Sequence, residues 1–249
     1  MSSAKQRLDI LLVEKGLAET RSKAQALIMS GLVFSGDKKL DKAGMNFKSD
    51  IEIIIKGKEH NWVSRGGLKL EHGLKTFNFD AHGITAIDVG ASTGGFTDVL
   101  LKNGAEKIYA VDVGYGQLAY SIRENPKVVV LERTNARYLT AEQIPEKVDA
   151  VVCDASFISL KTVLPSALSM LKNNGWVIAL IKPQFEAGKE NIGKKGVVKD
   201  PEIHKQVCDD IESWFKSQPN FNVQSITQSP ITGPEGNIEF LIGVTFEKK

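Results

Sequence analysis

The chain has 249 residues and a mass of 27.3 kDa, which corresponds to one or two domains. Its 42% hydrophobic and 25% charged residues, with a mean hydropathy of -0.15, exclude disordered, fibrous and membrane-spanning classes of protein. The two cysteines, Cys153 and Cys208, show no metal-binding spacing and no disulfide framework. We therefore expect no structural metal and, because charges interrupt every early apolar stretch, a cytoplasmic protein without a signal peptide.

The net charge of +2 is unevenly distributed along the chain. Residues 1–60 contain 11 Lys+Arg against 8 Asp+Glu, whereas residues 61–249 contain 21 against 22. Charge runs of this size are commonly solvated surface, so charge alone does not establish binding to nucleic acid.

The first 60 residues predict a compact unit of two short helices followed by strands. Apolar residues at helical spacing predict a helix over 7–13, which Gly16 ends. Thr20 is a suitable N-cap for a second helix that runs to Gly31. A turn and a strand-like run at 51–55 complete the unit.

Two cations fall in the first turn of that second helix, at Arg21 and Lys23. Cations are unfavourable at a helix N-terminus, where the backbone N–H groups favour a phosphate. Their position therefore favours a functional role, such as contact with a phosphate.

From residue 84 the pattern changes to apolar runs separated by amphipathic helices such as 96–102 and 159–171. Five runs are typical of strands buried on both faces: 84–89, 107–113, 127–131, 149–153 and 176–181. This alternation predicts an α/β fold with a doubly wound parallel sheet. After a helix near 202–216, two further strands are expected at 222–228 and 238–246. The turn between them is too short for a crossover, so this pair must be antiparallel.

A glycine-rich segment follows the first strand of the sheet. Gly90, Gly94 and Gly95 stand at a strand-to-helix turn, where glycine lets a ligand or another backbone approach closely. The spacing differs from the dinucleotide fingerprint and from a P-loop. Asp112 ends the next strand, where an acid accepts the hydroxyls of a ribose. Together with Asp88 before the glycines, this arrangement is typical of S-adenosylmethionine (SAM) methyltransferases.

Three ionisable residues stand at or inside apolar strands: Asp154, Lys182 and Glu239. A charge in such a position is costly unless it is paired, so each residue predicts a partner. Asp154 and Lys182 follow the carboxyl ends of their strands and are therefore expected at the cofactor edge. Lys69 opens the helix ahead of the first strand.

Several longer motifs carry a family resemblance. They are VSRGGLKL at 63–70, DVGASTGGFT at 88–97, DASFISL at 154–160, IKPQFE at 181–186 and GNIE at 236–239. With its basic N-terminal unit, the chain resembles the TlyA family of ribosomal RNA methyltransferases, sometimes named hemolysins, whose catalytic domain is similar to the FtsJ-type ribose 2'-O-methyltransferases. The resemblance implies a small alpha-L RNA-binding domain at 1–60, a linker at 61–67 and a Rossmann-like methyltransferase domain at 68–249. That domain would hold a mostly parallel seven-stranded sheet with a terminal antiparallel strand.

The resemblance also implies site residues. The catalytic tetrad would be Lys69, Asp154, Lys182 and Glu239. The SAM contacts would be Asp88, Gly90, Ala91, Ser92, Thr93, Gly94, Gly95, Phe96, Asp112, Asn135 and Ala136. We expect RNA contacts from Arg7, Arg21, Lys23, Arg65, Lys189, Lys194 and Lys195. The last three belong to a glycine-containing stretch, 189–199, which we expect to be a mobile loop that orders over bound RNA.

Methylation of a ribose 2'-OH requires a positioned methyl donor and removal of the hydroxyl proton. SAM supplies an activated methyl group, so we expect no metal requirement. We expect Lys182 to take the proton, Asp154 and Glu239 to orient it, and Lys69 to help place the hydroxyl. The predicted partners are ribosomal RNA or ribosomal subunits, with a cytidine of 16S rRNA, 23S rRNA or both as the substrate.

The sequence disfavours three alternative functions. A catalytically silent RNA-binding assembly factor is disfavoured because all four tetrad residues are present. A membrane-lytic hemolysin is disfavoured because the sequence has no strongly amphipathic basic helix. A base or small-molecule methyltransferase is disfavoured because base N-methylation commonly uses a polar-Pro-Pro-aromatic loop, whereas this chain has Asp-Ala-Ser-Phe at 154–157.

Overall fold

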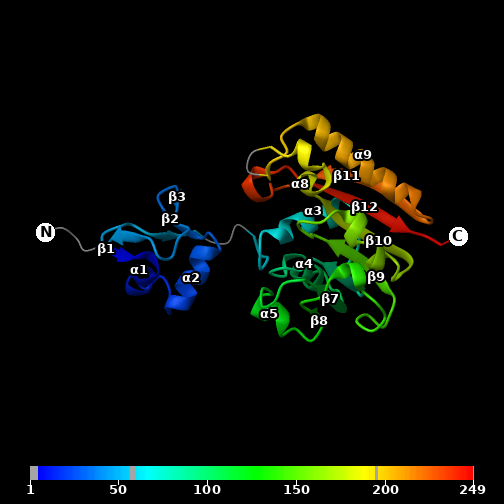
Figure 1. The fold of residues 1–249 in the computed structure, drawn as a ribbon. Coiled ribbons are helices and arrows are strands. Elements are labelled where there is room, and N and C mark those ends of the chain that lie inside the picture. The colour runs from blue at the N-terminus through cyan, green and yellow to red at the C-terminus, as the bar shows by residue number, and fades with distance from the viewer. Residues whose placement is uncertain (1–4, 57–59, 194–195, 249) are drawn as a thin grey trace. The chain divides into compact units, whose positions relative to one another are not determined.

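The computed structural model describes residues 5–56, 60–193 and 196–248 (Figure 1). By its internal contacts the chain divides into two compact units, Met1–Asn61 and Trp62–Lys249. Trp62 packs in a core cluster of the second unit, and the backbone N–H of Val63 donates to Asp98 Oδ2 at 2.8 Å. The first residues of the second unit, expected from the sequence to be a linker, are thus held by its core.

The N-terminal unit packs two helices on short antiparallel strands. Its elements are β1 (Lys5–Arg7), α1 (Leu8–Glu14), α2 (Arg21–Met29), β2 (Val33–Ser35), β3 (Lys38–Lys39), β4 (Asn46–Lys48) and β5 (Ile54–Ile55). Thr20 Oγ1 accepts a hydrogen bond from the Lys23 backbone N–H at 3.2 Å, which confirms the predicted cap. The strand expected over 51–55 is reduced to two residues, because only Ile54 and Ile55 pair with β2.

The second unit is built on a seven-stranded sheet. Its strands are β6 (Thr85–Val89), β7 (Lys107–Val111), β8 (Val128–Leu131), β9 (Val148–Cys153), β10 (Leu171–Ile181), β11 (Phe221–Gln228) and β12 (Phe240–Phe246). Their order is β11-β12-β10-β9-β6-β7-β8, and β12 is antiparallel to both of its neighbours. The pairs among β6, β7, β8, β9 and β10 are parallel, which confirms the predicted fold class.

Helices cover both faces of this sheet, because alternate strand residues feed two different cores. Helices α3 (Gly66–Phe77) and α4 (Gly95–Lys102) share one core with Ala86 and Ile108, and α5 (Tyr120–Arg123) packs beside them on Ala110. Helices α6 (Leu160–Val163), α7 (Pro165–Leu168) and α9 (Pro201–Ser217) share the other core with Ile87 and Val151. No helix among the described residues is long and apolar enough to span a bilayer.

Two expectations about the second unit were wrong in detail. The helix expected over 159–171 is broken into α6 and α7, because Pro165 lacks the N–H that a continuous helix needs, and β10 already begins at Leu171. Glu239 was expected inside a strand but directly precedes β12. Within the described residues, further short elements are α8 (Pro183–Glu186) and the 3-10 turns at Ala136–Tyr138, Lys189–Asn191 and Pro234–Gly236.

Candidate active site

Two neighbouring cavities open at the carboxyl ends of the parallel strands. The larger has a volume of about 590 Å³, and the smaller has a volume of about 320 Å³. Both are lined by Gly90, Ser92, Asp154 and Ser156. A ligand in the larger cavity and a group in the smaller one would therefore contact the same four residues. The larger volume falls in the usual range for small-molecule sites.

The glycine loop between β6 and α4 forms the wall that the two cavities share. Gly90 has φ of +82°, and a Cβ at this position would lie 2.8 Å from the Cα atom of Ala155. The loops that follow β6 and β9 thus cross too closely for any side chain. Gly94 has φ of +92° and precedes the first residue of α4. Glycine is required at both positions for these reasons.

Asp112 is fixed at the end of β7 by two backbone donors. Its Oδ2 accepts from the Ser92 N–H at 2.8 Å, and its Oδ1 accepts from the Gly114 N–H at 2.7 Å. These hydrogen bonds join the glycine loop to the loop after β7 and hold the carboxylate on the wall of the larger cavity. A carboxylate oxygen has more than one lone pair, so each can also accept from a ligand hydroxyl.

The eleven residues expected to contact SAM fall into three groups. The larger cavity is lined by Gly90, Ser92, Asp112, Asn135 and Ala136. The smaller cavity is lined by Gly90, Ala91, Ser92, Thr93, Gly95 and Phe96. Asp88 and Gly94 line neither cavity. Asp88 is buried in β6, and Gly94 is the N-cap of α4.

Asp88 is a fully buried acid beneath the glycine loop. Its Oδ2 accepts a hydrogen bond from Thr97 Oγ1 at 2.6 Å, whereas Oδ1 has no hydrogen-bond partner among the described residues. Burial raises the pKa of this carboxyl to about 7, and the Thr97 hydroxyl opposes the rise only in part. Near neutral pH the carboxyl of Asp88 therefore populates both its neutral and its charged form.

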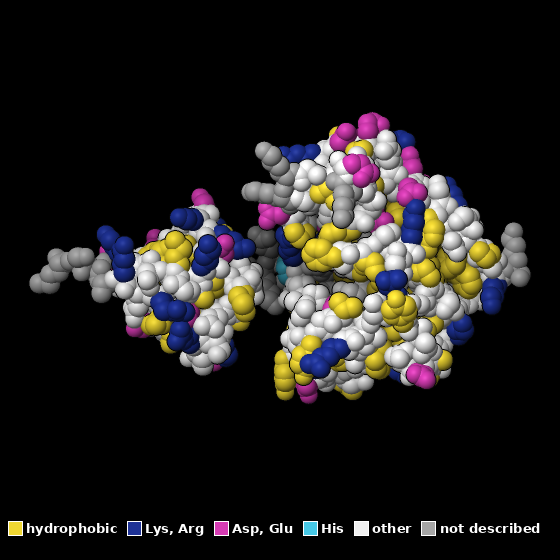
Figure 2. Space-filling view, viewed as in Figure 1, with side chains coloured by type: hydrophobic (Ala, Val, Ile, Leu, Met, Phe, Trp, Pro, Cys, Tyr) yellow, Lys and Arg dark blue, Asp and Glu magenta, His cyan; other side chains and the backbone are white. Residues whose placement is uncertain are grey.

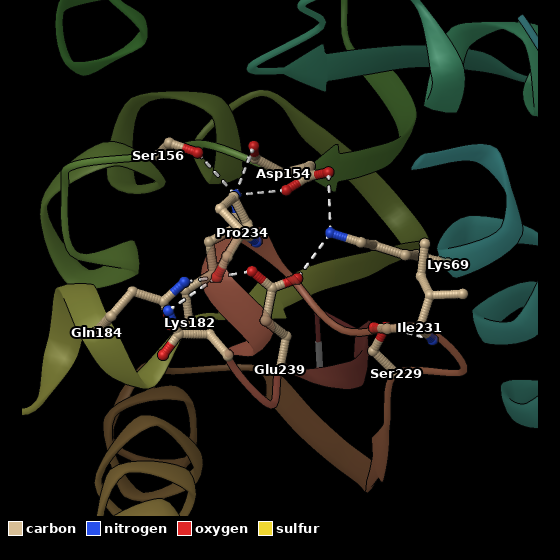
Figure 3. Close-up of polar contacts among 10 residues, drawn as sticks. Lys69, Asp154, Ser156, Lys182, Gln184, Ser229, Ile231, Pro234 and Glu239 are labelled. Carbon is tan, nitrogen blue, oxygen red and sulfur yellow. Dashed lines mark hydrogen bonds and ion pairs between the residues drawn. The ribbon is translucent and has the colours of Figure 1, made fainter. Parts of the chain in front are cut away.

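The four residues of the implied tetrad lie together, although they come from four segments of the chain (Figure 3). Lys182 Nζ is 2.6 Å from Asp154 Oδ1, and Lys69 Nζ is 3.7 Å from Asp154 Oδ2. Lys69 Nζ also lies 2.6 Å from Glu239 Oε2. Charges thus alternate along the cluster, and both lysines and Glu239 are buried while Asp154 is 21% exposed. All four residues line the smaller cavity.

The pairing within the cluster differs from the sequence-based expectation. Glu239 was expected to orient Lys182, but its contacts are with Lys69 and with Gln184, whose Nε2 donates to Glu239 Oε1 at 3.3 Å. Lys182 is instead held by Asp154 and by Ser156 Oγ at 2.8 Å. Phe240, the first residue of β12, pairs with Ile181, so Glu239 lies beside Lys182 along the sheet, yet its carboxylate contacts Lys69 instead.

Ser156, Phe157 and Gln184 lie within the sequence motifs at 154–160 and 181–186, but no role was predicted for them. Phe157 is 90% exposed on the rim of the larger cavity, next to the ring of Phe185. The available signal for this position was an aromatic residue three positions after the charged strand-end residue Asp154. For Gln184 the signal was a polar residue two positions after Lys182.

The basic residues expected to bind RNA in the N-terminal unit are paired with acids. Arg7 donates from Nε and Nη2 to the two carboxylate oxygens of buried Asp9, each at 3.0 Å. Arg21 Nε also donates to Asp9 at 2.8 Å, and Lys23 forms an ion pair with Glu19. These cations keep a solvent-exposed portion, and on the face in Figure 2 basic side chains are spread over this unit with acidic ones between them.

The other expected RNA contacts lie in the second unit. Arg65 is exposed at the smaller cavity, just before α3. Lys194 and Lys195 lie outside the described residues, as does the side chain of Lys189. The expected mobile loop over 189–199 therefore stays a prediction.

Comparison with known proteins agrees with this geometry. Residues 62–246 match the FtsJ-like methyltransferase family, and residues 6–53 match the S4 domain. The chain belongs to the FtsJ-like methyltransferase family. Within that family it is of the TlyA type, because a Mycobacterium tuberculosis protein named 16S/23S rRNA (cytidine-2'-O)-methyltransferase TlyA is 43% identical over 95% of this chain and 88% of its own length.

Two further relatives show that the FtsJ-like domain and the N-terminal unit occur together. The Bacillus subtilis protein YqxC, named as a candidate rRNA methyltransferase, is 49% identical over 97% of this chain and 86% of its own length. A solved structure of a candidate hemolysin from Streptococcus thermophilus has a TM-score of 0.76 and 41% identity, and covers 98% of this chain and 90% of its own. This FtsJ-like methyltransferase is thus an enzyme with an N-terminal S4 domain.

Proposed function

We propose that this FtsJ-like methyltransferase transfers the methyl group of SAM to a ribose 2'-OH of ribosomal RNA, with a cytidine of 16S rRNA, 23S rRNA or both as the target. The observation that carries the proposal is the alternating cluster of Lys182, Asp154, Lys69 and Glu239, which lines a cavity that shares a wall with a second cavity of nucleoside size. The names of the relatives supply the substrate class. Ribosomal RNA as a substrate would place the protein in the cytoplasm.

The residues of the larger cavity fit the proposed cofactor. Asp112 would accept the ribose hydroxyls of SAM, because its carboxylate is already oriented at the cavity wall by Ser92 and Gly114. Gly90 would allow the loops after β6 and β9 to approach each other closely, so that Gly90 and Asp154 would both border the sulfonium end of the cofactor. Bound SAM would supply a methyl group that needs no further activation.

In the smaller cavity the chain's own residues would position the hydroxyl and receive its proton. In its neutral form, Lys182 Nζ would take the proton of the 2'-OH while the ribose oxygen bonds to the methyl carbon and the bond between that carbon and the sulfur breaks. Asp154 and Ser156 would hold the amine of Lys182 in place, since both contact it in the structure. Lys69, held by Glu239, would donate to the ribose oxygen and fix its line of attack.

All four tetrad side chains are present and are joined by three consecutive contacts, which favours an active enzyme over a catalytically silent assembly factor. The S4 domain would supply part of the RNA affinity, with Arg7, Arg21 and Lys23 on its surface. Arg65 would meet RNA at the mouth of the smaller cavity, and Lys189, Lys194 and Lys195 would contact it from the stretch after α8. We expect the reaction to need no metal.

A transfer assay tests the proposal directly. The full-length protein would be incubated with SAM that carries a tritiated methyl group and with ribosomal subunits from a strain that lacks the enzyme. The expected product is a 2'-O-methylated cytidine in a nuclease digest, formed equally with and without chelator. Label on a base, or transfer to free nucleosides but not to subunits, would contradict the proposed reaction.

A further inference from the structure

Two arginine–tyrosine pairs flank the wall of the larger cavity. The guanidinium carbon of Arg133 lies 4.2 Å from the ring centroid of Tyr115, and that of Arg137 lies 5.3 Å from the ring centroid of Tyr138. Both tyrosines are about two-thirds exposed, at 67% and 66%, and both arginines are exposed. An exposed phenol ring next to an exposed guanidinium is a surface suited to a planar, negatively charged partner.

Arg133 and Arg137, like Arg65, have no carboxylate partner within the described part of the chain, in contrast to the other three arginines. Arg7 and Arg21 are paired with Asp9, and Arg123 is paired with Glu132. Glu132 immediately precedes Arg133, but its carboxylate is occupied by Arg123 and by the N–H of Gly116. The positive charges of Arg133 and Arg137 are therefore available to a ligand.

The position of the pairs connects them to the proposed chemistry. The three residues between the arginines, Thr134, Asn135 and Ala136, line the larger cavity together with Asp154. The Arg133 N–H donates to the Gly114 carbonyl at 3.0 Å, and Ser166 Oγ donates to the Arg137 carbonyl at 2.5 Å. The backbone that carries both cations is thus fixed at the cavity rim.

We propose that Arg133 with Tyr115 and Arg137 with Tyr138 form a docking surface for single-stranded RNA that flanks the target nucleotide; this inference rests on the proposed function. The guanidinium groups would bind phosphates, and the tyrosine rings would stack with unpaired bases. A double helix keeps its bases stacked on each other, so it would use the cations but not the rings. Acidic side chains instead gather over α9, which carries Glu202, Asp209, Asp210 and Glu212 (Figure 2).

Binding of RNA by the full-length protein tests the surface. The probes are a labelled oligouridylate, an RNA duplex of the same length and isolated ribosomal subunits. The double variant Arg133→Ala with Arg137→Ala is expected to bind oligouridylate and subunits more weakly. The slope of log affinity against log salt concentration should decrease by roughly 1.4, because each phosphate contact on a single strand contributes about 0.7. Lys205→Ala is the control and should leave both quantities unchanged, since Lys205 is paired with Asp209 on α9 and lines neither of the two site cavities.

Substitution of the two tyrosines distinguishes the contribution of base stacking to RNA affinity from that of charge. Replacement of both Tyr115 and Tyr138 by Ala should weaken oligouridylate binding at least about five-fold and leave the salt slope unchanged, whereas replacement by Phe should retain binding. Wild-type affinity in the double arginine variant at every salt concentration would overturn the surface. Loss of duplex binding alone would overturn the assignment to single strands. Neither result depends on methyl transfer, so failure of the proposed reaction would be recognised separately, as absence of 2'-O-methylation by the wild-type protein.

Discussion

Lys182 Nζ and Asp154 Oδ1 lie 2.6 Å apart, although 28 residues separate the two in sequence. Strands β9 and β10 are parallel neighbours, so the residues that follow their carboxyl ends meet at one edge of the sheet. The same edge holds both cavities, so this ion pair lies where the proposed cofactor site and the proposed substrate site meet.

Replacement of Lys182 by Ala is expected to abolish methyl transfer while SAM binding and RNA binding persist. The loss in the single-turnover rate should be about 100- to 10,000-fold, the usual contribution of a positioned acid or base. Lys182→Arg should be nearly as inactive, because a guanidinium does not accept a proton at usable pH. Calorimetry with SAM serves as the control for folding. A near wild-type transfer rate in Lys182→Ala would exclude the assigned role.

Replacement of Asp112 by Ala is expected to weaken SAM binding by about 10- to 150-fold, the range for hydrogen bonds that involve a charged group. The variant loses the proposed acceptor for the ribose hydroxyls and also frees the N–H groups of Ser92 and Gly114. Asp112→Asn should be intermediate, since one oxygen remains to accept. Asp80→Ala, at an exposed position, is the matched control. Calorimetry that finds unchanged SAM affinity in Asp112→Ala would contradict the site.

The raised pKa of Asp88 predicts that stability falls as pH rises. Between an ordinary carboxyl pKa near 3.8 and its folded value of about 7, the folded protein binds a proton that the unfolded chain has released. The free energy of unfolding, relative to that of Asp88→Asn, should therefore decrease by about 1.4 kcal/mol per pH unit across this window and level off above it. Denaturant titrations of both proteins at several pH values measure this difference. A difference that stays constant with pH would show that Asp88 is charged throughout.

The two arginines on Asp9 are expected to respond differently to replacement by Ala. Arg7 directs both Nε and Nη2 at Asp9, whereas Arg21 uses Nε and keeps its Nη groups for a phosphate. Arg21→Ala should therefore lower RNA affinity and the salt dependence of binding. Arg7→Ala should mainly lower the thermal midpoint of the N-terminal unit, because buried Asp9 loses its principal partner.

Asp9, the carboxylate that both arginines contact, gives a second pH-dependent expectation. Hydrogen bonds from Arg7, and further ones from Gln25 and Arg21, hold the pKa of Asp9 far below its usual range. Such a group stabilises the folded state above a pH near 4 and loses this contribution as the pH falls toward its lowered pKa. The free energy of unfolding of the wild type should exceed that of Asp9→Asn at neutral pH, and this difference should shrink in acid.

For the two arginine variants, equal RNA affinity and equal stability of Arg7→Ala and Arg21→Ala would contradict the different roles assigned to these arginines.

Most of the catalytic fold could be predicted from sequence, because strands buried on both faces leave continuous apolar runs that alternate with amphipathic helices. The break at Pro165 was visible in the sequence, but the apolar spacing across it imitated one long helix. The partner of Glu239 could not be predicted, since it depends on β12 entering the sheet between β10 and β11. The pairing of Arg21 with Asp9 was likewise invisible, because it joins two helices through a tertiary contact.

The tetrad contains two lysines and two carboxylates in one contact chain, so its formal charges cancel. Loss of any one member leaves an unmatched charge in a largely buried place, and such a charge is expensive. Descendants of this enzyme that abandoned catalysis would therefore tolerate the joint loss of Lys69 and Glu239 more readily than the loss of either alone. Inactive relatives should therefore have lost one lysine and one carboxylate of the cluster together, which keeps its net charge at zero. Such joint loss would identify these relatives as former enzymes.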